Sequence, residues 1–308
     1  MMYFDTFNPK KTLKLVELKK NFDFLDNLYQ KEKFPKVLLL TGNKGEGKFS
    51  LVSHFMHYIY DKPNYNFKEN IILKEGIFHK QFLNDIYPNI IYLNGISFEK
   101  IKIEDIRSLK SQLSRRPINE NKRFIILDDV EIFNMNSLNA LLKLIEEPNK
   151  DNFFILINNK TRRILDTIKS RCLEIKIYLK ENPRKNIIKN LINYFDLEKI
   201  LNENLIKTSP GNFIKFNYLF SELDLNIEGD FIKNLNLLLT RYKKEKDIFF
   251  KNFIFYYIDY YIEFLKIKNK IDNKRIIENR FFLLKNINNF FLYNLNQSTL
   301  LSFLKTKF

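Results

Sequence analysis

The chain has one cysteine, Cys172, and no tryptophan among its 308 residues. A single cysteine excludes an internal disulfide framework and a zinc site built from cysteines, so a reducing cytoplasm is the expected location. Glycine and proline are also scarce, with seven and eight residues. Their few clusters therefore indicate where the backbone turns.

Long apolar runs are missing as well. The start of the chain has no stretch of the length that a signal peptide needs. The most apolar segment, residues 248–267, is interrupted by Lys251, Asp259 and Glu263, each of which is costly inside a bilayer. We therefore expect a buried amphipathic helix there and no contact with a membrane.

Hydrophobic residues make up 45% of the chain and charged residues 29%, a balance typical of a folded protein. The formal net charge is +16, which favours acidic partners, nucleic acid first. The abundance of Lys, Asn, Ile, Phe and Tyr also matches what AT-rich coding DNA would produce. Net charge alone does not locate a basic patch, so both explanations stay open.

Short apolar runs alternate with helical patterns in the first part of the chain. Five runs predict buried strands, at residues 37–41, 90–93, 124–127, 153–157 and 173–177. Helical spacing predicts helices at 48–60, 103–113 and 138–145. This alternation indicates a parallel sheet covered on both faces, with ligands at the carboxyl ends of the strands.

After about Lys180 the remaining pattern is helical. A Thr-Ser-Pro-Gly turn at 208–211 breaks this pattern, and a second boundary falls near 223–229. We therefore expect an α/β domain at 1–178, a small helical domain at 179–222 and an all-helical domain at 223–308.

A phosphate-binding loop follows the first predicted strand. Residues 42–48 read Gly-Asn-Lys-Gly-Glu-Gly-Lys, which matches G-x-x-x-x-G-K. In this motif, backbone N–H groups and the start of the next helix attract phosphate. The candidate nucleotide-binding residues are Gly42, Gly45, Gly47 and Lys48.

The residue after the loop departs from the motif. A Ser or Thr normally stands there, because its hydroxyl coordinates Mg²⁺. Here the position holds Phe49, and the hydroxyl follows at Ser50. One residue along a helix is a rotation of about 100°. Ser50 is kept as a nucleotide-binding candidate, but metal-assisted hydrolysis is not expected.

The third predicted strand ends in two acids, Asp128 and Asp129. This is the form of a Walker B motif, in which Asp128 would hold Mg²⁺ through water. Asp129 would stand where active ATPases carry the Glu that orients the attacking water. Asp is one methylene shorter, and a misplacement of about 1 Å is costly. Acids at strand ends also serve as solvated or helix-capping groups.

Two further motifs decide between these alternatives. Residues 136–148 read Asn-Ser-Leu-Asn-Ala-Leu-Leu-Lys-Leu-Ile-Glu-Glu-Pro, and residues 170–172 read Ser-Arg-Cys. In order and spacing, with the P-loop and the two acids, they resemble the N-A-L-L-K-x-x-E-E-P and S-R-C signatures of clamp-loader subunits, which are AAA+ proteins. The resemblance is clear over 34–177 and architectural beyond.

The resemblance implies an AAA+ P-loop domain, a helical lid domain and a helical collar domain, in which several subunits pack into a ring. Aromatic side chains surround the predicted helix at 248–267, and we expect some of them to be buried against another chain.

The resemblance also implies roles for single residues. The arginine of S-R-C is an arginine finger that reaches the ATP of a neighbouring subunit, which implies this role for Arg171. The sensor 1 position falls on Asn158, with Asn159 as an adjacent alternative. Asn212 stands where the family usually has the sensor 2 arginine.

Phe49, Asp129 and Asn212 together imply that ATP hydrolysis by the chain itself is weak or absent. An altered site with an intact arginine finger resembles the stator class, called delta-prime in bacterial DNA polymerase III. That class implies a hetero-pentamer with gamma/tau-type and delta-type subunits, which loads the sliding clamp onto primed DNA. It implies ATP or ADP with Mg²⁺ at most, and no zinc, because residues 60–90 lack cysteine.

Three other functions compete with this one. A working gamma/tau-like ATPase would hydrolyse ATP alone and depend on Lys48. A small-molecule P-loop kinase would need an arginine-bearing lid and would leave Ser-Arg-Cys without a role. A nucleic-acid-binding protein that uses no ATP would bind DNA alone in a salt-sensitive way.

Overall fold

The computed structural model describes residues 6–95, 103–118, 122–269 and 273–306. It divides into two compact units. The first extends to Leu191 and also includes residues 209–212, and the second comprises residues 192–208 and 213–308. The predicted division at 178 and 222 stays a prediction, because a compact unit of packing need not coincide with a functional domain.

A five-stranded parallel sheet forms the centre of the first unit. In spatial order the strands are β4 (Ile90–Asn94), β5 (Arg123–Asp128), β6 (Asn152–Asn158), β1 (Val37–Thr41) and β7 (Leu173–Lys176). The five predicted strands and their parallel arrangement are confirmed. The fifth ends one residue earlier than predicted, although the N–H of Ile177 still donates to the carbonyl of Thr41 at 2.8 Å.

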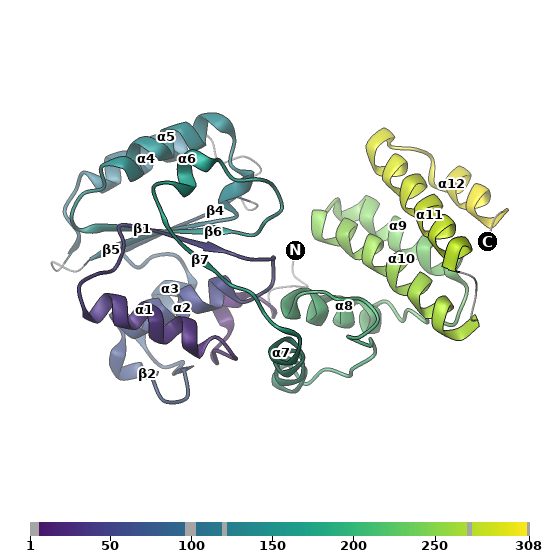
Figure 1. Ribbon diagram of the computed structural model, residues 1–308, viewed down its shortest axis with the longest axis horizontal. Helices are drawn as coiled ribbons and strands as arrows, with labels where there is room; N and C mark the ends of the chain where they lie inside the picture. The colour runs from purple at the N-terminus through teal and green to yellow at the C-terminus, as the bar shows by residue number, and fades with distance from the viewer. Residues whose placement is uncertain (1–5, 96–102, 119–121, 270–272, 307–308) are drawn as a thin grey trace. The chain divides into compact units, whose positions relative to one another are not determined.

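Helices cover both faces of this sheet (Figure 1). On one face lie α1 (Lys19–Gln30), α2 (Lys48–Tyr60) and α3 (Ile77–Leu83), and on the other lie α4 (Ile103–Leu113), α5 (Met135–Glu146) and α6 (Asp166–Lys169). Successive side chains of a strand point to opposite faces. Leu38 and Leu40 accordingly join the core under α1 and α2, whereas Val37 and Leu39 join the core under α4 and α5.

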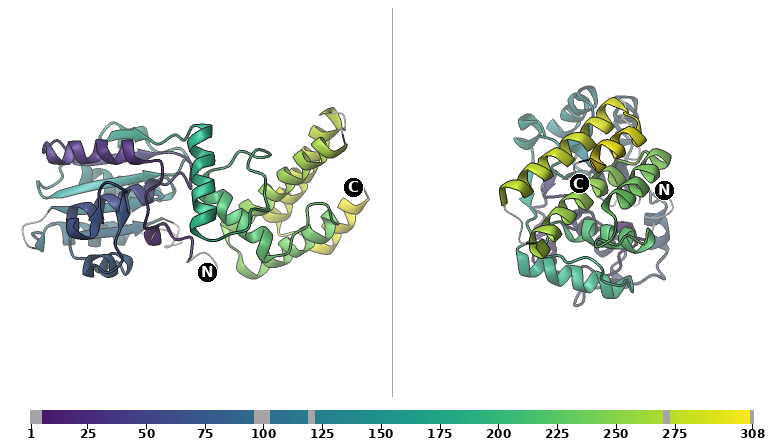
Figure 2. Two further views of the ribbon diagram at one scale, coloured as in Figure 1. Left: turned by 90° about the horizontal axis from the view of Figure 1, so that it is seen from below. Right: turned by 90° about the vertical axis from the view of Figure 1, so that its right-hand side faces the viewer.

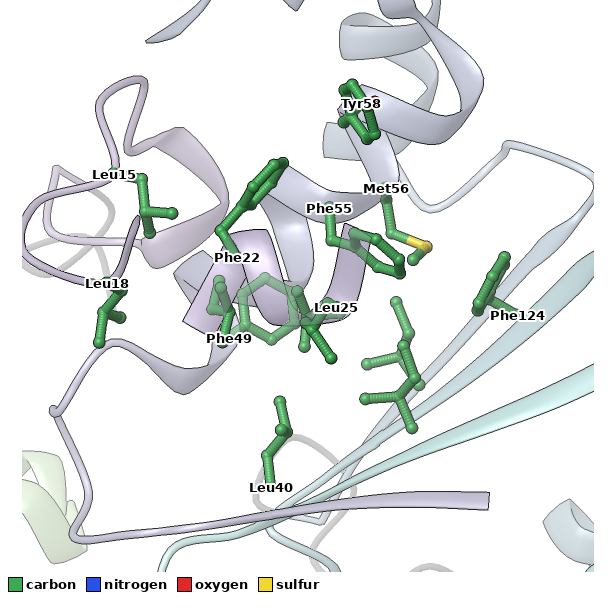
Figure 3. Packing of buried hydrophobic residues seen from close by; sticks show 14 of the residues in the cluster. Leu15, Leu18, Phe22, Leu25, Leu40, Phe49, Phe55, Met56, Tyr58 and Phe124 are labelled. Carbon is green, nitrogen blue, oxygen red and sulfur yellow. The ribbon is translucent and has the colours of Figure 1, made fainter. Parts of the chain in front are cut away.

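The core on the α1 and α2 face is rich in aromatic rings (Figure 3). Phe22, Phe55 and Phe124 are fully buried there. Phe22 and Phe55 meet edge to face with centroids 6.2 Å apart, and Phe55 and Phe124 do so at 6.3 Å. Such contacts add to the free energy gained by burying the rings. They fix α2, and with it the loop that precedes α2, against the sheet.

Several elements were not predicted from the sequence. They are α1, α3, α6, the short helices η2 (Pro9–Lys11), η3 (Lys62–Asn64) and η5 (Val130–Ile132), and a hairpin of β2 (Tyr65–Asn66) and β3 (Ile71–Ile72). Strands of two residues are too short to show the alternation that identifies a strand.

The remainder of the described chain is helical, as predicted (Figures 1 and 2). It contains α7 (Glu181–Tyr194), α8 (Pro210–Glu222), α9 (Phe231–Glu245), α10 (Ile248–Asn269), α11 (Asn273–Tyr293) and α12 (Gln297–Lys305). No helix in the described residues is long and apolar enough to cross a membrane.

Helix α10 is the centre of the second unit and contacts both α9 and α11. Every aromatic side chain on α10 is buried or half-buried within the chain. Tyr256, for example, packs on Phe216 with centroids 4.5 Å apart. Most aromatic residues of α10 are therefore buried by their own unit, whereas Phe249, Phe255, Tyr261 and Phe264 are only half-buried. The expected burial of some of them against another chain stays a prediction.

Replacing Phe22 by Ala should lower the free energy of unfolding by about 3–5 kcal/mol, because it leaves a cavity in the aromatic core. The matched control is Phe24→Ala on the same helix. Phe22 is 0% exposed and Phe24 is 47% exposed, so the control should change stability by less than about 1 kcal/mol. Denaturant unfolding followed by circular dichroism measures both, and equal losses would contradict the packing described.

Candidate functional site

The predicted phosphate-binding loop leaves β1 at Gly42 and leads into α2. Gly45 and Gly47 have φ angles of 87° and 86°, in the left-handed region that glycine adopts without strain. The Glu46 carboxylate turns back into the loop. It accepts the N–H of Asn43 at 2.7 Å and the Asn43 Nδ2 at 3.1 Å. The loop is thus braced from within by an acid.

Lys48, the lysine of the motif, is buried at the start of α2. Its Nζ donates to the carbonyl oxygens of Gly42 at 2.8 Å and Asn43 at 2.7 Å. Burial lowers the pKa of Lys48 to about 8, and the carboxylate of Glu46 opposes this effect. At neutral pH most of the lysine therefore keeps its charge, as phosphate binding requires.

A segment far away in sequence packs on this loop within the same compact unit. The Ser209 hydroxyl donates to the carbonyl of Lys44 at 2.5 Å, and the N–H of Gly211 donates to the carbonyl of Gly45 at 3.0 Å. A Cβ on Gly211 would lie 3.1 Å from the Gly45 Cα. The segment that the resemblance assigns to sensor 2 therefore lies directly against the phosphate-binding loop.

The two predicted acids lie beside the loop. Both carboxylate oxygens of the buried Asp129 are 3.2 Å from the Nζ of Lys44. Burial, and next the neighbouring Asp129 carboxylate, raise the pKa of Asp128 to about 6, whereas Lys44 opposes the shift. The sequence predicted ligands at the carboxyl ends of the parallel strands, and the structure brings the P-loop and these acids together there.

The structure distinguishes the two candidate asparagines at the end of β6. The Nδ2 of Asn159 donates to Asp129 Oδ1 at 2.8 Å and to Asp128 Oδ1 at 3.2 Å. Asn158, in contrast, uses its Oδ1 to accept the N–H of Lys160 at 2.9 Å. Asn159 is thus the residue brought to the acids, and the hydrogen bonds favour it over Asn158 for the sensor 1 position.

Glu131 is a site residue that the sequence patterns did not identify. It is only 4% exposed. Its Oε1 accepts the N–H of Asn159 at 3.1 Å and the hydroxyl of Thr161 at 2.7 Å, and its Oε2 is buried with no hydrogen-bond partner in the described residues. Glu131 holds the loop that carries Asn159. The one sequence feature that could have indicated a buried acid here is that Glu131 stands between two apolar residues, Val130 and Ile132.

Phe49 occupies the position where the motif has its hydroxyl. The ring is buried and meets Tyr92 edge to face with centroids 5.2 Å apart. The core contact explains an aromatic residue here. Ser50, the predicted substitute, is half-buried one position further along α2, which is a rotation of about 100°.

Arg171 lies at the opposite end of the sheet. It lies two residues before the start of β7, and β7 pairs in parallel with β1 so that Leu173 lies beside Leu38. The P-loop begins at Gly42, four residues further along β1. At about 3.3 Å per residue this is about 13 Å of strand. The Arg171 side chain therefore cannot reach the phosphate-binding loop of its own chain.

Replacing Asp128 by Asn should stabilise the protein near neutral pH. Because the folded state holds the Asp128 proton more tightly than the unfolded state, this residue lowers stability as pH rises from about 4 to about 6. We expect a gain of about 1–2 kcal/mol at pH 7 that disappears below about pH 4.

Denaturant unfolding at a series of pH values measures this gain. The control is Asp166→Asn, which changes an exposed acid and should show no comparable gain. A gain at Asp128 that is the same at pH 4 and pH 7, or a loss at pH 7, would contradict the electrostatics described.

The chain is similar to subunits of bacterial DNA polymerase III. A family described as "DNA polymerase III, delta subunit" matches residues 18–181. The delta' subunit of Bacillus subtilis is 28% identical over 153 residues, 48% of this chain and 44% of that protein. The gamma subunit of Buchnera aphidicola from Schizaphis graminum is 25% identical over 199 residues, 63% of this chain and 53% of that protein.

A solved structure, a DNA polymerase III gamma subunit-related protein from Thermotoga maritima, aligns with 91% of this chain and 97% of its own. Its sequence identity is 17% and its TM-score is 0.46. The chain spans about half the length of the relatives it matches in sequence. Since the family match covers more than half of the 308 residues, the chain belongs to the DNA polymerase III delta subunit family.

Proposed function

We propose that this chain is a stator subunit, of the delta-prime type, in a cytoplasmic DNA polymerase III clamp loader. In this role it supplies Arg171 to the ATP site of a neighbouring subunit. The complex, a hetero-pentamer with gamma/tau-type and delta-type subunits, loads the sliding clamp onto primed DNA. The similarity to delta' and gamma subunits supports membership of such a complex.

The position of Arg171 is the observation that carries this proposal. Its side chain is 36% exposed, and it lies at the amino end of the sheet, away from its own P-loop. A planar guanidinium is well suited to the spread charge of a phosphoryl group in transfer. The phosphoryl group that Arg171 contacts must belong to another chain.

The contacts around the chain's own loop support weak or absent hydrolysis. Gly45, Gly47 and Lys48 fit a nucleotide's phosphates, and Mg²⁺ would polarise these phosphates when bound. Phe49, however, gives the metal no hydroxyl, and Asp129 is paired with Lys44 at 3.2 Å. ATP or ADP would be held here more as a structural ligand than as a substrate.

Exposed apolar side chains support assembly through the helical C-terminal region, the proposed collar. Ile277 and Phe281 are 66% and 68% exposed. They are four residues apart on α11, so they lie on one face of that helix. Such a pair is suited to burial against another subunit.

Replacing Arg171 by Ala should strongly lower the rate of hydrolysis at the neighbouring site. The loader is reconstituted with the P-loop lysine substituted in every motor subunit except the one that Arg171 is proposed to contact. The measured ATP hydrolysis then comes from that one site. The DNA-stimulated rate at that site should fall by about 10³-fold, because an arginine finger contributes at least this much.

The matched control is Arg163→Ala, which removes an arginine that is 83% exposed from the same segment and should leave the rate unchanged. Size-exclusion chromatography should show that both variants assemble. An unchanged rate in the Arg171 variant would remove the stator proposal.

The isolated chain should not hydrolyse ATP measurably, since Phe49 and Asp129 alter two of its catalytic positions. The similarity to gamma subunits favours one alternative, a working ATPase. In that case the purified chain would hydrolyse ATP, and Lys48→Ala would abolish the activity. Phosphate release by the pure chain and by this variant decides between the two functions.

A further inference from the structure

Two of the sequence motifs touch each other through a single ion pair. Glu146 is the last residue of α5, and Arg171 follows α6. The Arg171 Nη2 lies 2.7 Å from the Glu146 Oε1. The Nη1 donates to the carbonyl of Thr167 at 2.8 Å and approaches the Ser170 hydroxyl at 3.4 Å. The guanidinium is thus held from two sides.

The backbone on both sides of this pair is anchored in one core. The N–H of Arg171 donates to the carbonyl of Ile168 at 3.1 Å, and the Cys172 thiol donates to the same carbonyl at 3.0 Å. Ile168 and Ile145, the neighbour of Glu146, are buried in the same apolar cluster, with Cys172 packed against it. The relative position of the two charged residues is therefore set by packing.

Stability does not explain why an acid stands at this position. Glu146 lies in the last turn of α5, where the helix dipole is negative and disfavours a carboxylate. The Glu146 and Arg171 side chains are 45% and 36% exposed, and ion pairs with this exposure contribute little to folding. What the pair does provide is a fixed orientation for a long and otherwise flexible side chain.

We propose that Glu146 is a positioning residue that holds the Arg171 guanidinium ready for the phosphates of a neighbouring subunit's nucleotide. This inference rests on the proposed function of Arg171. A guanidinium has five N–H donors, and within the described residues three contacts engage it. At least two donors remain for phosphoryl oxygens. Glu146 therefore orders the side chain without occupying all of its donors.

The experiment uses the reconstituted loader in which only the site next to Arg171 reports. Glu146→Ala should lower kcat for DNA-stimulated hydrolysis by about tenfold, since small errors in the position of a reacting group are costly. KM for ATP should be unchanged. Glu146→Gln, which keeps an acceptor oxygen, should restore part of the rate.

The matched control is Glu147→Ala, which removes the adjacent exposed carboxylate at the same helix end and should leave kcat unchanged. A double-mutant cycle adds the decisive readout. In an Arg171→Ala background, Glu146→Ala should have no further effect on the residual rate, because Glu146 acts through Arg171. Thermal unfolding and size-exclusion chromatography check that each variant folds and assembles.

Each remaining outcome is informative. If Arg171→Ala lowers the rate but Glu146→Ala leaves it unchanged or raises it, the positioning role is overturned and the stator role stands. An equal loss from Glu146→Ala in both backgrounds also overturns it, since Glu146 would then act independently of Arg171. If Arg171→Ala itself has no effect on the rate, the proposed stator function is contradicted, and the positioning role of Glu146 is overturned with it.

Discussion

The parallel pairing of β5 with β6, of β6 with β1 and of β1 with β7 determines where the candidate site residues lie. In a parallel sheet all carboxyl ends meet at one edge. The P-loop after β1, Asp128 at the end of β5 and Asn159 after β6 are brought together for this reason. The same pairing places Arg171, just before β7, at the opposite edge. The candidate residues of this domain therefore lie at two opposite ends of the sheet.

The carboxyl edge of the sheet concentrates buried charge. The charged Lys48 Nζ is hydrogen-bonded to backbone carbonyls of its own loop, and Asp129 is paired with Lys44. Glu46 and Glu131 satisfy backbone N–H groups in the two loops that flank the acids. Buried ionised groups cost free energy unless they are paired or hydrogen-bonded. The raised pKa of Asp128 reports that this compensation is incomplete.

An incomplete balance of this kind is typical of sites that bind charged ligands, because selection for binding competes with selection for stability. Phe49, which stands where the motif has a hydroxyl, shows the opposite case, a candidate site position that serves packing. Phe49 serves the aromatic core through its contact with Tyr92. At this position the side chain packs in the core and offers no hydroxyl, whereas the neighbouring Lys48 places its Nζ against the carbonyl of Gly42 in the loop.

Much of the fold and of the candidate site followed from local patterns. The five strands were predicted because a buried parallel strand leaves an unbroken apolar run. The P-loop was predicted because its glycines and lysine have a fixed spacing. The structure gives a physical reason for both fixed glycines, since Gly47 has a left-handed φ angle and a Cβ on Gly42 would lie 2.6 Å from the carbonyl oxygen of Ile177. The hairpin of β2 and β3 was missed because strands of two residues carry no period.

The amino-acid sequence by itself therefore determined which elements form and which residue types stand at their ends, since these depend on neighbours along the chain. Only the tertiary structure decided which of two adjacent asparagines meets the acids, that Glu131 supports their loop, and that Glu146 holds Arg171. These contacts join residues 25 to 30 positions apart. Strand register and core packing determine which of these distant residues meet, and a local sequence pattern contains no information about either.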